Sequence, residues 1–561
     1  MGSYTRVIAG VPISREPSAV TRTRSRVVLS KERVGLLVVA AAIAYFLAVS
    51  LVGLSDPGLQ YDELLFVNAA LGGTHAYHGF IASEALGVPT MLMTYIGALK
   101  AWLYAPVFSV FGVSVDSVRV PAVLLAALAL VLAVVMARRL LGTWPALAFA
   151  VLLGTDPVLS SMSRADWGPI VLSALLRVSA LLAYFAFLRR REARYLWLLV
   201  LALSLGVFNK LDYGWFIVGL LAAALVMHRR ELWRIVRSRP GAMLPPLVFQ
   251  VIVAIVVFFE IALPAERLPR AGHLSIGARI TEVENLFRGT FDGAAVYQYM
   301  TGSLLAHATL MGSLFPWVLL GSCGVAGWFA VWGRRRAQDD PLRARASTTA
   351  FFVVLFIVVA LGITATRQAA GPHNIFLLWP LPSLLAICLL ATALALPWRS
   401  PRLAAVTVLG IAVLALLATQ VRTSLEYVHA YRDRREWTAP WSPEIYAAAS
   451  AVSHSATGVT SIITADWGVG TQIFALGDEA VRNRFQDEWP SFLSPTATTT
   501  SLDQEFFQSS VIVVFHTPLG QIMPGTTARV EAVLRSLGGR AHVLYRGRQI
   551  EADIVSAPGS G

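Results

Sequence analysis

Long apolar runs, separated by short charged connections, make up most of this 561-residue chain. The first run, from Val34 to Leu54, has about 21 residues, which is enough to cross a bilayer as a helix. A cleaved secretion signal has a shorter apolar region and a small-residue cleavage site, so we predict an uncleaved helix after a basic cytoplasmic tail, 1–33. Further crossings are predicted near residues 118–137, 143–160, 170–188, 195–209, 213–228, 244–263, 305–332, 348–365, 374–396 and 403–421, which makes eleven in all.

Arginine clusters occupy alternate connections between these runs, whereas acidic residues dominate the other connections. The clusters are Arg138-Arg139, Arg189–Arg191 with Arg194, the stretch from Arg229 to Arg239, Arg334–Arg336 with Arg343 and Arg345, and Arg399 with Arg402. Cytoplasmic loops of membrane proteins are enriched in Lys and Arg, so the clusters and the N-terminal tail are predicted to lie on the inner side. The acidic connections then lie on the outer side.

Residues 89–112 are apolar enough to cross but contain Lys100, one of only three lysines in the chain. If they crossed, every later arginine cluster would move to the outer side. We therefore predict helices that lie on the outer surface or re-enter it, within a long first outer loop, 55–117.

The composition changes after residue 421. Residues 422–561 are predicted to form a small soluble α/β domain on the outer side, and residues 34–421 to form the membrane module. The domain's strand-like runs are Thr460–Ala465, Ser510–Phe515 and His542–Tyr545, and its helical pattern is Thr526–Leu537, followed by Gly538-Gly539.

Composition supports a mainly α, polytopic membrane protein, because 56% of the residues are hydrophobic and only 14% are charged, against about 25% in soluble proteins. The net charge of +13 is located at the ends of apolar runs, so we expect a lipid bilayer as partner and no nucleic acid. Cys323 and Cys388 lie inside apolar runs and give no metal-ligand spacing. No cofactor is predicted, although the acidic outer loops leave a divalent cation open.

Asp62 and Glu63 are the first candidate catalytic residues. They follow the first membrane exit closely, in an apolar and aromatic setting that includes Tyr61 and Phe66. A carboxylate at this place can accept the proton of a hydroxyl acceptor while a lipid-borne group is attacked. Adjacent side chains on an ordered segment point in different directions, so we expect only one of the two to face the acceptor.

Basic residues in three other outer turns are candidates for binding a phosphate. Arg164 precedes Asp166 in the second outer loop, Lys210 lies in the third, and Arg367 and His373 lie in a later turn. A guanidinium matches phosphate oxygens in a bidentate manner, and Asp166 is a candidate to hold Arg164 or to assist catalysis. The alternatives are an internal salt bridge for Arg164, a simple polar turn for Lys210 and a helix cap for His373.

Taken together, these motifs resemble the C-type glycosyltransferases. They are the Asp62-Glu63 pair in a long first outer loop, Ser163-Arg164 followed by Asp166, and Gly371-Pro372-His373-Asn374 leading into Leu378-Trp379-Pro380-Leu381-Pro382. The most similar branch is family 39, which contains the protein O-mannosyltransferases and the bacterial aminoarabinose transferases. The order and outer placement of the motifs match across residues 34–421.

The resemblance implies the C-type fold and a polyprenyl- or dolichyl-phosphate sugar donor. It also implies an inverting transfer on the outer membrane face, with Asp62 as the base and outer basic residues on the donor phosphate. We expect a bacterial cytoplasmic membrane and a hydroxyl acceptor on a glycan, lipid or protein.

Two other functions remain open from the residues alone. A lipid or glycan transporter typically shows paired halves with Gly- or Pro-broken helices in corresponding positions, and neither is evident here. An assembly protein whose soluble domain binds a partner would leave the acids of the outer loops unexplained.

Overall fold

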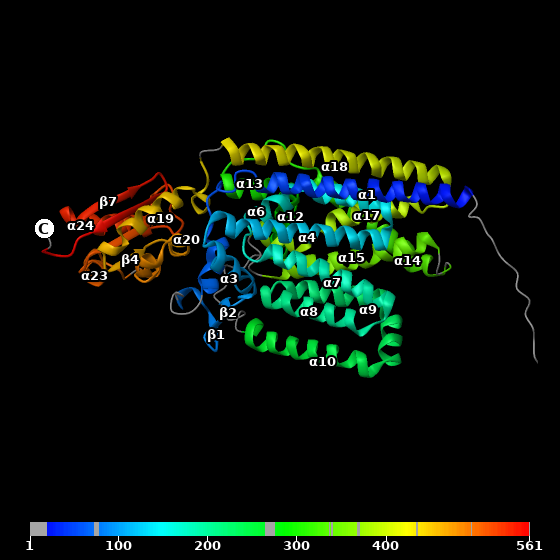
Figure 1. Cartoon of the computed structure of the whole chain (residues 1–561), viewed down its shortest axis with the longest axis horizontal. Coiled ribbons are helices and arrows are strands. Elements are labelled where there is room, and N and C mark those ends of the chain that lie inside the picture. The colour runs from blue at the N-terminus through cyan, green and yellow to red at the C-terminus, as the bar shows by residue number, and fades with distance from the viewer. Residues whose placement is uncertain are drawn as a thin grey trace, which may run out of the picture.

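A computed structural model describes residues 19–71, 78–263, 275–335, 337, 340–366, 371–433, 436–494 and 496–559. Most of these residues form a bundle of long helices that run side by side, and a small α/β domain lies at one end of the bundle (Figure 1). The bundle helices are α1 (Ala19–Leu51), α4 (Val115–Leu141), α5 (Thr143–Gly154), α6 (Pro157–Arg164), α7 (Ile170–Arg190), α8 (Ala193–Asn209), α9 (Tyr213–Ser238), α10 (Pro240–Val257), α14 (Met311–Val331), α15 (Pro341–Ala365), α16 (Pro372–Ile375), α17 (Leu381–Leu394) and α18 (Arg399–Asp433).

Each of the eleven runs that were predicted to cross overlaps at least one of these helices, although the run 305–332 becomes helical only at Met311. Within the described residues, eight helices are long and apolar enough to span a membrane, or nine if α5 and α6, which meet at a 51° bend, form one span. Helix α8 has only 17 residues and α9 becomes charged after Met227, so neither meets this test, although both pack within the bundle (Figure 1). The predicted polytopic helical bundle is confirmed.

Helix α4 shows how the sequence sets these elements. Ser114 and Ser117 form a reciprocal capping box at its start, which satisfies backbone N–H groups that the helix leaves open. Its 27 residues correspond to about 40 Å, more than the thickness of the hydrocarbon core. Arg138 and Arg139 in the last turn interact favourably with the negative end of the helix dipole.

The first outer loop differs from the prediction over residues 89–97. Of residues 89–112, which were predicted to be helical, only the second part forms a helix, α3 (Leu99–Phe111), whereas residues 89–97 form strands of a three-stranded antiparallel sheet. Leu86 and Gly87 both have positive φ angles and make a two-residue hairpin turn, which apolar periodicity does not reveal. The elements of this loop are α2 (Tyr61–Leu71), β1 (Ser83–Ala85), β2 (Val88–Met93), β3 (Ile96–Gly97) and α3 (Leu99–Phe111), and a later connection holds α12 (Ile276–Phe291) and α13 (Ala294–Thr301).

The α/β domain starts later than residue 422, because α18 continues to Asp433. Its five-stranded sheet has the order β5-β4-β6-β8-β7, with β5, β4 and β6 parallel and the other pairs antiparallel. Helices α19 and α20 cover one face of the sheet and α24 covers the other. The elements are α19 (Glu444–Ser455), β4 (Ser461–Thr464), α20 (Val469–Leu476), α21 (Glu479–Arg482), β5 (Phe485–Asp487), α22 (Trp489–Leu493), α23 (Thr499–Phe506), β6 (Val511–His516), α24 (Thr526–Leu537), β7 (Ala541–Arg546) and β8 (Ile550–Val555).

The three predicted strands and the predicted helix of this domain correspond to β4, β6, β7 and α24. The domain lies at the same end of the bundle as α3, β1 and β2 of the first outer loop (Figure 1), and its α20 packs against α2. The catalytic candidates on α2 are therefore enclosed between the bundle and the domain.

Candidate active site

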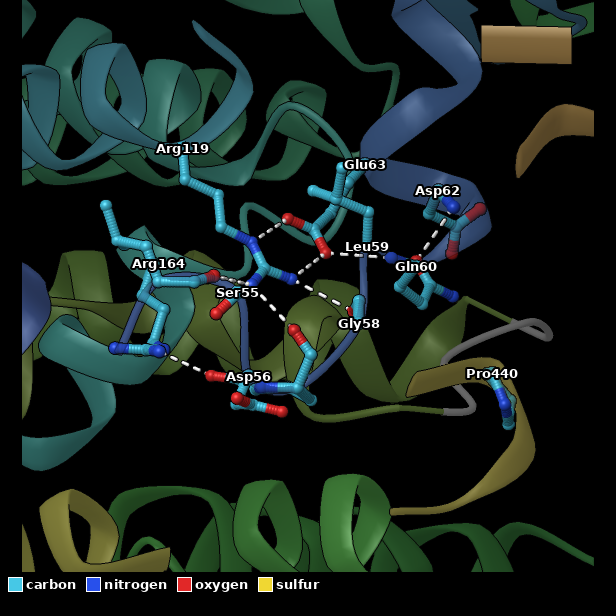
Figure 2. Close-up of polar contacts among 12 residues, drawn as sticks. Ser55, Asp56, Gly58, Leu59, Gln60, Asp62, Glu63, Arg119, Arg164 and Pro440 are labelled. Carbon is cyan, nitrogen blue, oxygen red and sulfur yellow. Dashed lines mark hydrogen bonds and ion pairs between the residues drawn. The ribbon is translucent and has the colours of Figure 1, made fainter. Parts of the chain in front are cut away.

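Asp62 and Glu63 begin α2, and their side chains point to opposite sides (Figure 2). Successive positions on a helix differ by about 100°, so a single acceptor atom cannot contact both carboxylates. Glu63 is fully buried and pairs with Arg119 of α4 through two bonds, Nη2 to Oε1 at 2.7 Å and Nε to Oε2 at 2.9 Å. The structure therefore pairs Glu63 with a buried arginine and directs the Asp62 carboxylate to another side.

Arg119 also shapes the chain that leads to α2. Its guanidinium donates to the carbonyl oxygens of Leu54, of Pro57 at 2.8 Å and of Gly58 at 3.0 Å (Figure 2). A planar fork of five N–H donors is suited to several acceptors at once. The bonds of one buried arginine therefore hold residues 54–63 in place.

Arg164, a predicted phosphate ligand, has a comparable structural role. It is fully buried and donates to the carbonyl oxygens of Ser50, Val52, Gly53 and Asp56 near the end of α1. Its guanidinium also lies 3.7 Å from the centre of the Tyr431 ring. These contacts satisfy carbonyl groups that a helix end leaves open, and they hold Arg164 away from the cavity described below.

Asp166, the third predicted catalytic residue, forms a buried ion pair with Lys100. Nζ of Lys100 lies 2.7 Å from Oδ2 of Asp166, and both side chains are almost completely excluded from solvent. The ammonium also lies over the rings of Phe66 and Tyr104, at 4.6 and 5.3 Å from their centres. This pair explains why a lysine interrupts an otherwise apolar stretch.

A cavity of about 710 Å³, called here the Asp62 cavity, brings together residues from distant parts of the chain. Its polar end is lined by Asp62, Lys210, Asp212, His373 and Asn374. The remainder is mostly apolar and lies largely between α9 and α10; it is lined by Ile217, Val218, Val253, Ala254, Val257 and Phe258. Of the predicted phosphate ligands, Lys210 and His373 reach this cavity, whereas Arg367 lies outside the described residues.

Lys210 is held in place at the polar end. Its Nζ lies 3.0 Å from Oδ2 of Asp212 and 3.3 Å from Oδ1 of Asn374. His373 lies beside Trp167, with 4.9 Å between the ring centres, and its Nδ1 atom is buried without a hydrogen-bond partner within the described residues. An ammonium group has three N–H donors, so Lys210 retains one for a further acceptor.

The carboxyl group of Asp62 lies in an environment that perturbs its acidity. Burial raises the pKa of Asp62 to about 6, although a hydrogen bond from Gln60, the charge of Lys210 and the Trp167 indole all favour the ionised form. The cation beside this group is Lys210, because Arg119 and Arg164 are bound elsewhere. A base with a pKa near the working pH can both accept and release a proton.

Sequence reasoning missed Trp167, Asn374 and Arg119. Arg119 lies inside a predicted crossing, and a charge in such a segment signals a buried partner. Trp167 carried no comparable signal, and Asn374 was named only as part of the motif that leads into Leu378. No group of three or more His, Cys, Asp and Glu residues that could hold a metal ion is found within the described ranges.

Comparison with known proteins gives a consistent result. Residues 97–259 match the family described as dolichyl-phosphate-mannose-protein mannosyltransferase. No curated protein sequence matches the chain significantly. The apo structure of ArnT from Cupriavidus metallidurans has a TM-score of 0.51 and 14% identity, and the match covers 94% of this chain and 98% of ArnT.

Two further structures match at lower scores. ArnT from the same organism bound to undecaprenyl phosphate has a TM-score of 0.49 and 13% identity, with 94% of this chain and 98% of ArnT covered. The apo oligosaccharyltransferase of Archaeoglobus fulgidus has a TM-score of 0.49 and 13% identity, with 86% of this chain and 69% of the enzyme covered. The chain is therefore a multi-pass membrane protein with the C-type glycosyltransferase fold, similar to family 39.

Proposed function

We propose that this chain is an integral-membrane glycosyltransferase that moves a sugar from a polyprenyl-phosphate donor to a hydroxyl acceptor on the outer membrane face. The observation that carries the proposal is the Asp62 cavity, which joins a carboxylate and an ammonium group at one end to an apolar cleft at the other. Such a cavity offers a base, a cation and a surface for a polyprenyl chain. The match of residues 97–259 to the mannosyltransferase family supports the same class of donor.

Lys210 and His373 form the donor side of this mechanism. The phosphate leaving group carries negative charge, so it requires charge stabilisation more than a proton. The remaining N–H of Lys210 can donate to the phosphate, and the unpartnered Nδ1 atom of His373 can also donate to it in the appropriate tautomer. The apolar residues of α9 and α10 contact the lipid chain.

Asp62 forms the acceptor side. Its carboxylate accepts the hydroxyl proton while the acceptor oxygen attacks the anomeric carbon, and the bond from that carbon to the phosphate oxygen breaks. Attack occurs on the face opposite the phosphate, so the configuration inverts. The acceptor is a hydroxyl group of a glycan, lipid or protein.

We assign the phosphate charge to these side chains and no metal cofactor to the reaction. The neighbouring carboxylates Glu63, Asp166 and Asp212 are each paired with Arg or Lys, which leaves Asp62 itself for the proton. The protein is proposed to work in a bacterial cytoplasmic membrane, with its active site and α/β domain on the outer side.

The test is the variant Asp62→Asn, which preserves the shape of the side chain and removes its basicity. We expect single-turnover transfer from a synthetic polyprenyl-phosphate sugar to fall by about 10²–10⁴-fold, while donor binding stays unchanged. Asp116→Asn is a matched control, because Asp116 is an exposed acid in the same outer loop. Full transfer by Asp62→Asn would remove Asp62 from the mechanism.

A further inference from the structure

Leu59, three residues before Asp62, is held by the α/β domain through both of its backbone polar groups. The N–H of Leu59 donates to the hydroxyl oxygen of Tyr446 at 3.1 Å. The side-chain amide of Gln472 donates to the carbonyl oxygen of Leu59 at 2.6 Å. Leu59 is completely buried, and buried backbone groups require such partners.

The same two side chains make further bonds along this part of the chain. The Tyr446 hydroxyl donates to the carbonyl oxygen of Ser55 at 3.2 Å, so it bridges two positions of the segment 55–61. Gln472 also reaches the carbonyl oxygen of Pro440 at 3.5 Å, and Gln472 is almost fully buried. Figure 2 shows Pro440 on one side of the segment 55–61 and Arg119 on the other.

Close packing reinforces this contact. The N–H of Gly58 donates to the carbonyl oxygen of Trp441 at 2.8 Å. A Cβ atom at Gly58 would lie 2.2 Å from the carbonyl oxygen of Ser442, so the approach requires glycine. The rings of Tyr61 and Trp467 meet edge to face, with 4.2 Å between their centres.

A short chain of bonds transmits this position to Asp62. The backbone N–H of Gln60 donates to Oε1 of Glu63 at 2.9 Å. The side-chain oxygen of Gln60 accepts the N–H of Asp62 at 2.7 Å (Figure 2). The first turn of α2, and with it the direction of the Asp62 carboxylate, is therefore fixed by the residues that Tyr446 and Gln472 hold.

We propose that Tyr446 and Gln472 are positioning residues for Asp62, so that the α/β domain forms part of the catalytic unit. Arg119 holds the segment 55–61 from the bundle side, and these two residues hold it from the domain side. The catalytic part of this inference rests on the proposed function. The placement of the segment can be measured without any assay of transfer.

The variants are Gln472→Leu and Tyr446→Phe, each of which removes polar contacts at nearly constant volume. Gln508→Leu is the matched control, because Gln508 is exposed and, among the described residues, its amide bonds only with Asp503 of the same domain. The full-length proteins in detergent are compared in single-turnover rate, affinity for undecaprenyl phosphate, the pH profile of transfer and amide hydrogen exchange over residues 55–66.

We expect the transfer rate to fall by up to about 10²-fold in both variants, because misplacement by 1 Å has an effect of this size. Donor affinity stays at the wild-type value, since Lys210 and the apolar cleft are untouched. Exchange over residues 55–66 becomes faster, and the acidic limb of the pH profile moves to lower pH as water reaches Asp62. The control shows none of these changes.

The outcomes separate the two proposals. Wild-type rate and wild-type exchange in both variants would overturn the positioning role, as would an equal loss of rate in Gln508→Leu. If the wild-type protein transfers no sugar, the proposed function fails, and the exchange rates alone decide whether the domain holds the segment. Tyr446→Phe removes a single oxygen atom, so it gives a folded variant for the comparison if Gln472→Leu does not fold.

Discussion

The Lys100–Asp166 ion pair provides a quantitative test of whether Asp166 is catalytic or structural. The variant Asp166→Asn removes the negative charge and leaves the Lys100 ammonium buried over the rings of Phe66 and Tyr104. Removing one partner of a buried pair typically costs about 3–5 kcal/mol, because the remaining charge loses its compensation. For a large domain, at roughly 2 °C per kcal/mol, this corresponds to a melting midpoint lowered by about 6–10 °C.

The double variant Lys100→Met/Asp166→Leu distinguishes this loss from a loss of chemistry. Replacing both members of a buried pair with apolar residues of similar volume is often neutral or stabilising, so we expect the melting midpoint to recover. Asp166 does not line the Asp62 cavity, so we also expect transfer to recover.

The assay is thermal unfolding of the purified full-length protein in one detergent, combined with single-turnover transfer below the melting midpoint of every variant. A single variant as stable as the wild type would refute the reasoning about uncompensated charge. A double variant that regains stability but transfers no sugar would show that Asp166 takes part in catalysis.

Two predictions concern the other side chains of the Asp62 cavity. Lys210→Met keeps much of the side-chain volume but removes the charge. We expect it to weaken binding of undecaprenyl phosphate by roughly 10–150-fold, which corresponds to about 1.5–3 kcal/mol for a charged hydrogen bond. Calorimetry of the purified protein measures the affinity, and an unchanged affinity would exclude Lys210 as a ligand. The transfer rate of the wild-type protein should fall as the pH drops below about 6 and be level above it. The reason is that Asp62 acts in its ionised form and that burial raises the pKa of Asp62 to about 6. A single-turnover pH series measures the rate, and a rate that stays level down to about pH 4 would contradict this prediction.

Sequence patterns predict the fold well because membrane spans depend on length and apolar composition, which are local properties. Each of the eleven apolar runs overlaps a helix, and α24 has the predicted bounds, Thr526–Leu537. The hairpin of β1 and β2 was missed because its signal is Gly87 in a two-residue turn rather than an apolar period. The end of α18 at Asp433 was missed because its last turns carry several polar residues, although Tyr427 and Tyr431 there pack against Tyr297 and Arg164.

The candidate site was predicted only in part, because charges can be located in a sequence whereas their partners cannot. Asp62, Lys210 and His373 come from three separate outer turns, and the structure brings all three to one cavity. Arg164 was assigned to the donor phosphate on equal grounds, but its guanidinium is used by the carbonyl groups that end α1. Nothing in the local sequence distinguishes a cation that lines the cavity, such as Lys210, from one that binds backbone carbonyl groups, such as Arg164.

Two of the buried cations, Arg119 and Arg164, share a property that connects them to Asp62, the proposed base. Arg119 and Arg164 both donate to carbonyl groups between Ser50 and Gly58, so the chain that leaves α1 is organised around two guanidinium groups before it reaches Asp62. Such bonds are worth more in a buried site than in water, and they leave the segment few alternative conformations. A carboxylate that must face an incoming hydroxyl at a membrane surface requires a fixed backbone. Here that backbone is held by charged residues that the sequence alone would suggest are catalytic. In the proposed mechanism Asp62 acts without a second catalytic acid, because Glu63 is paired with Arg119 and Asp166 is paired with Lys100.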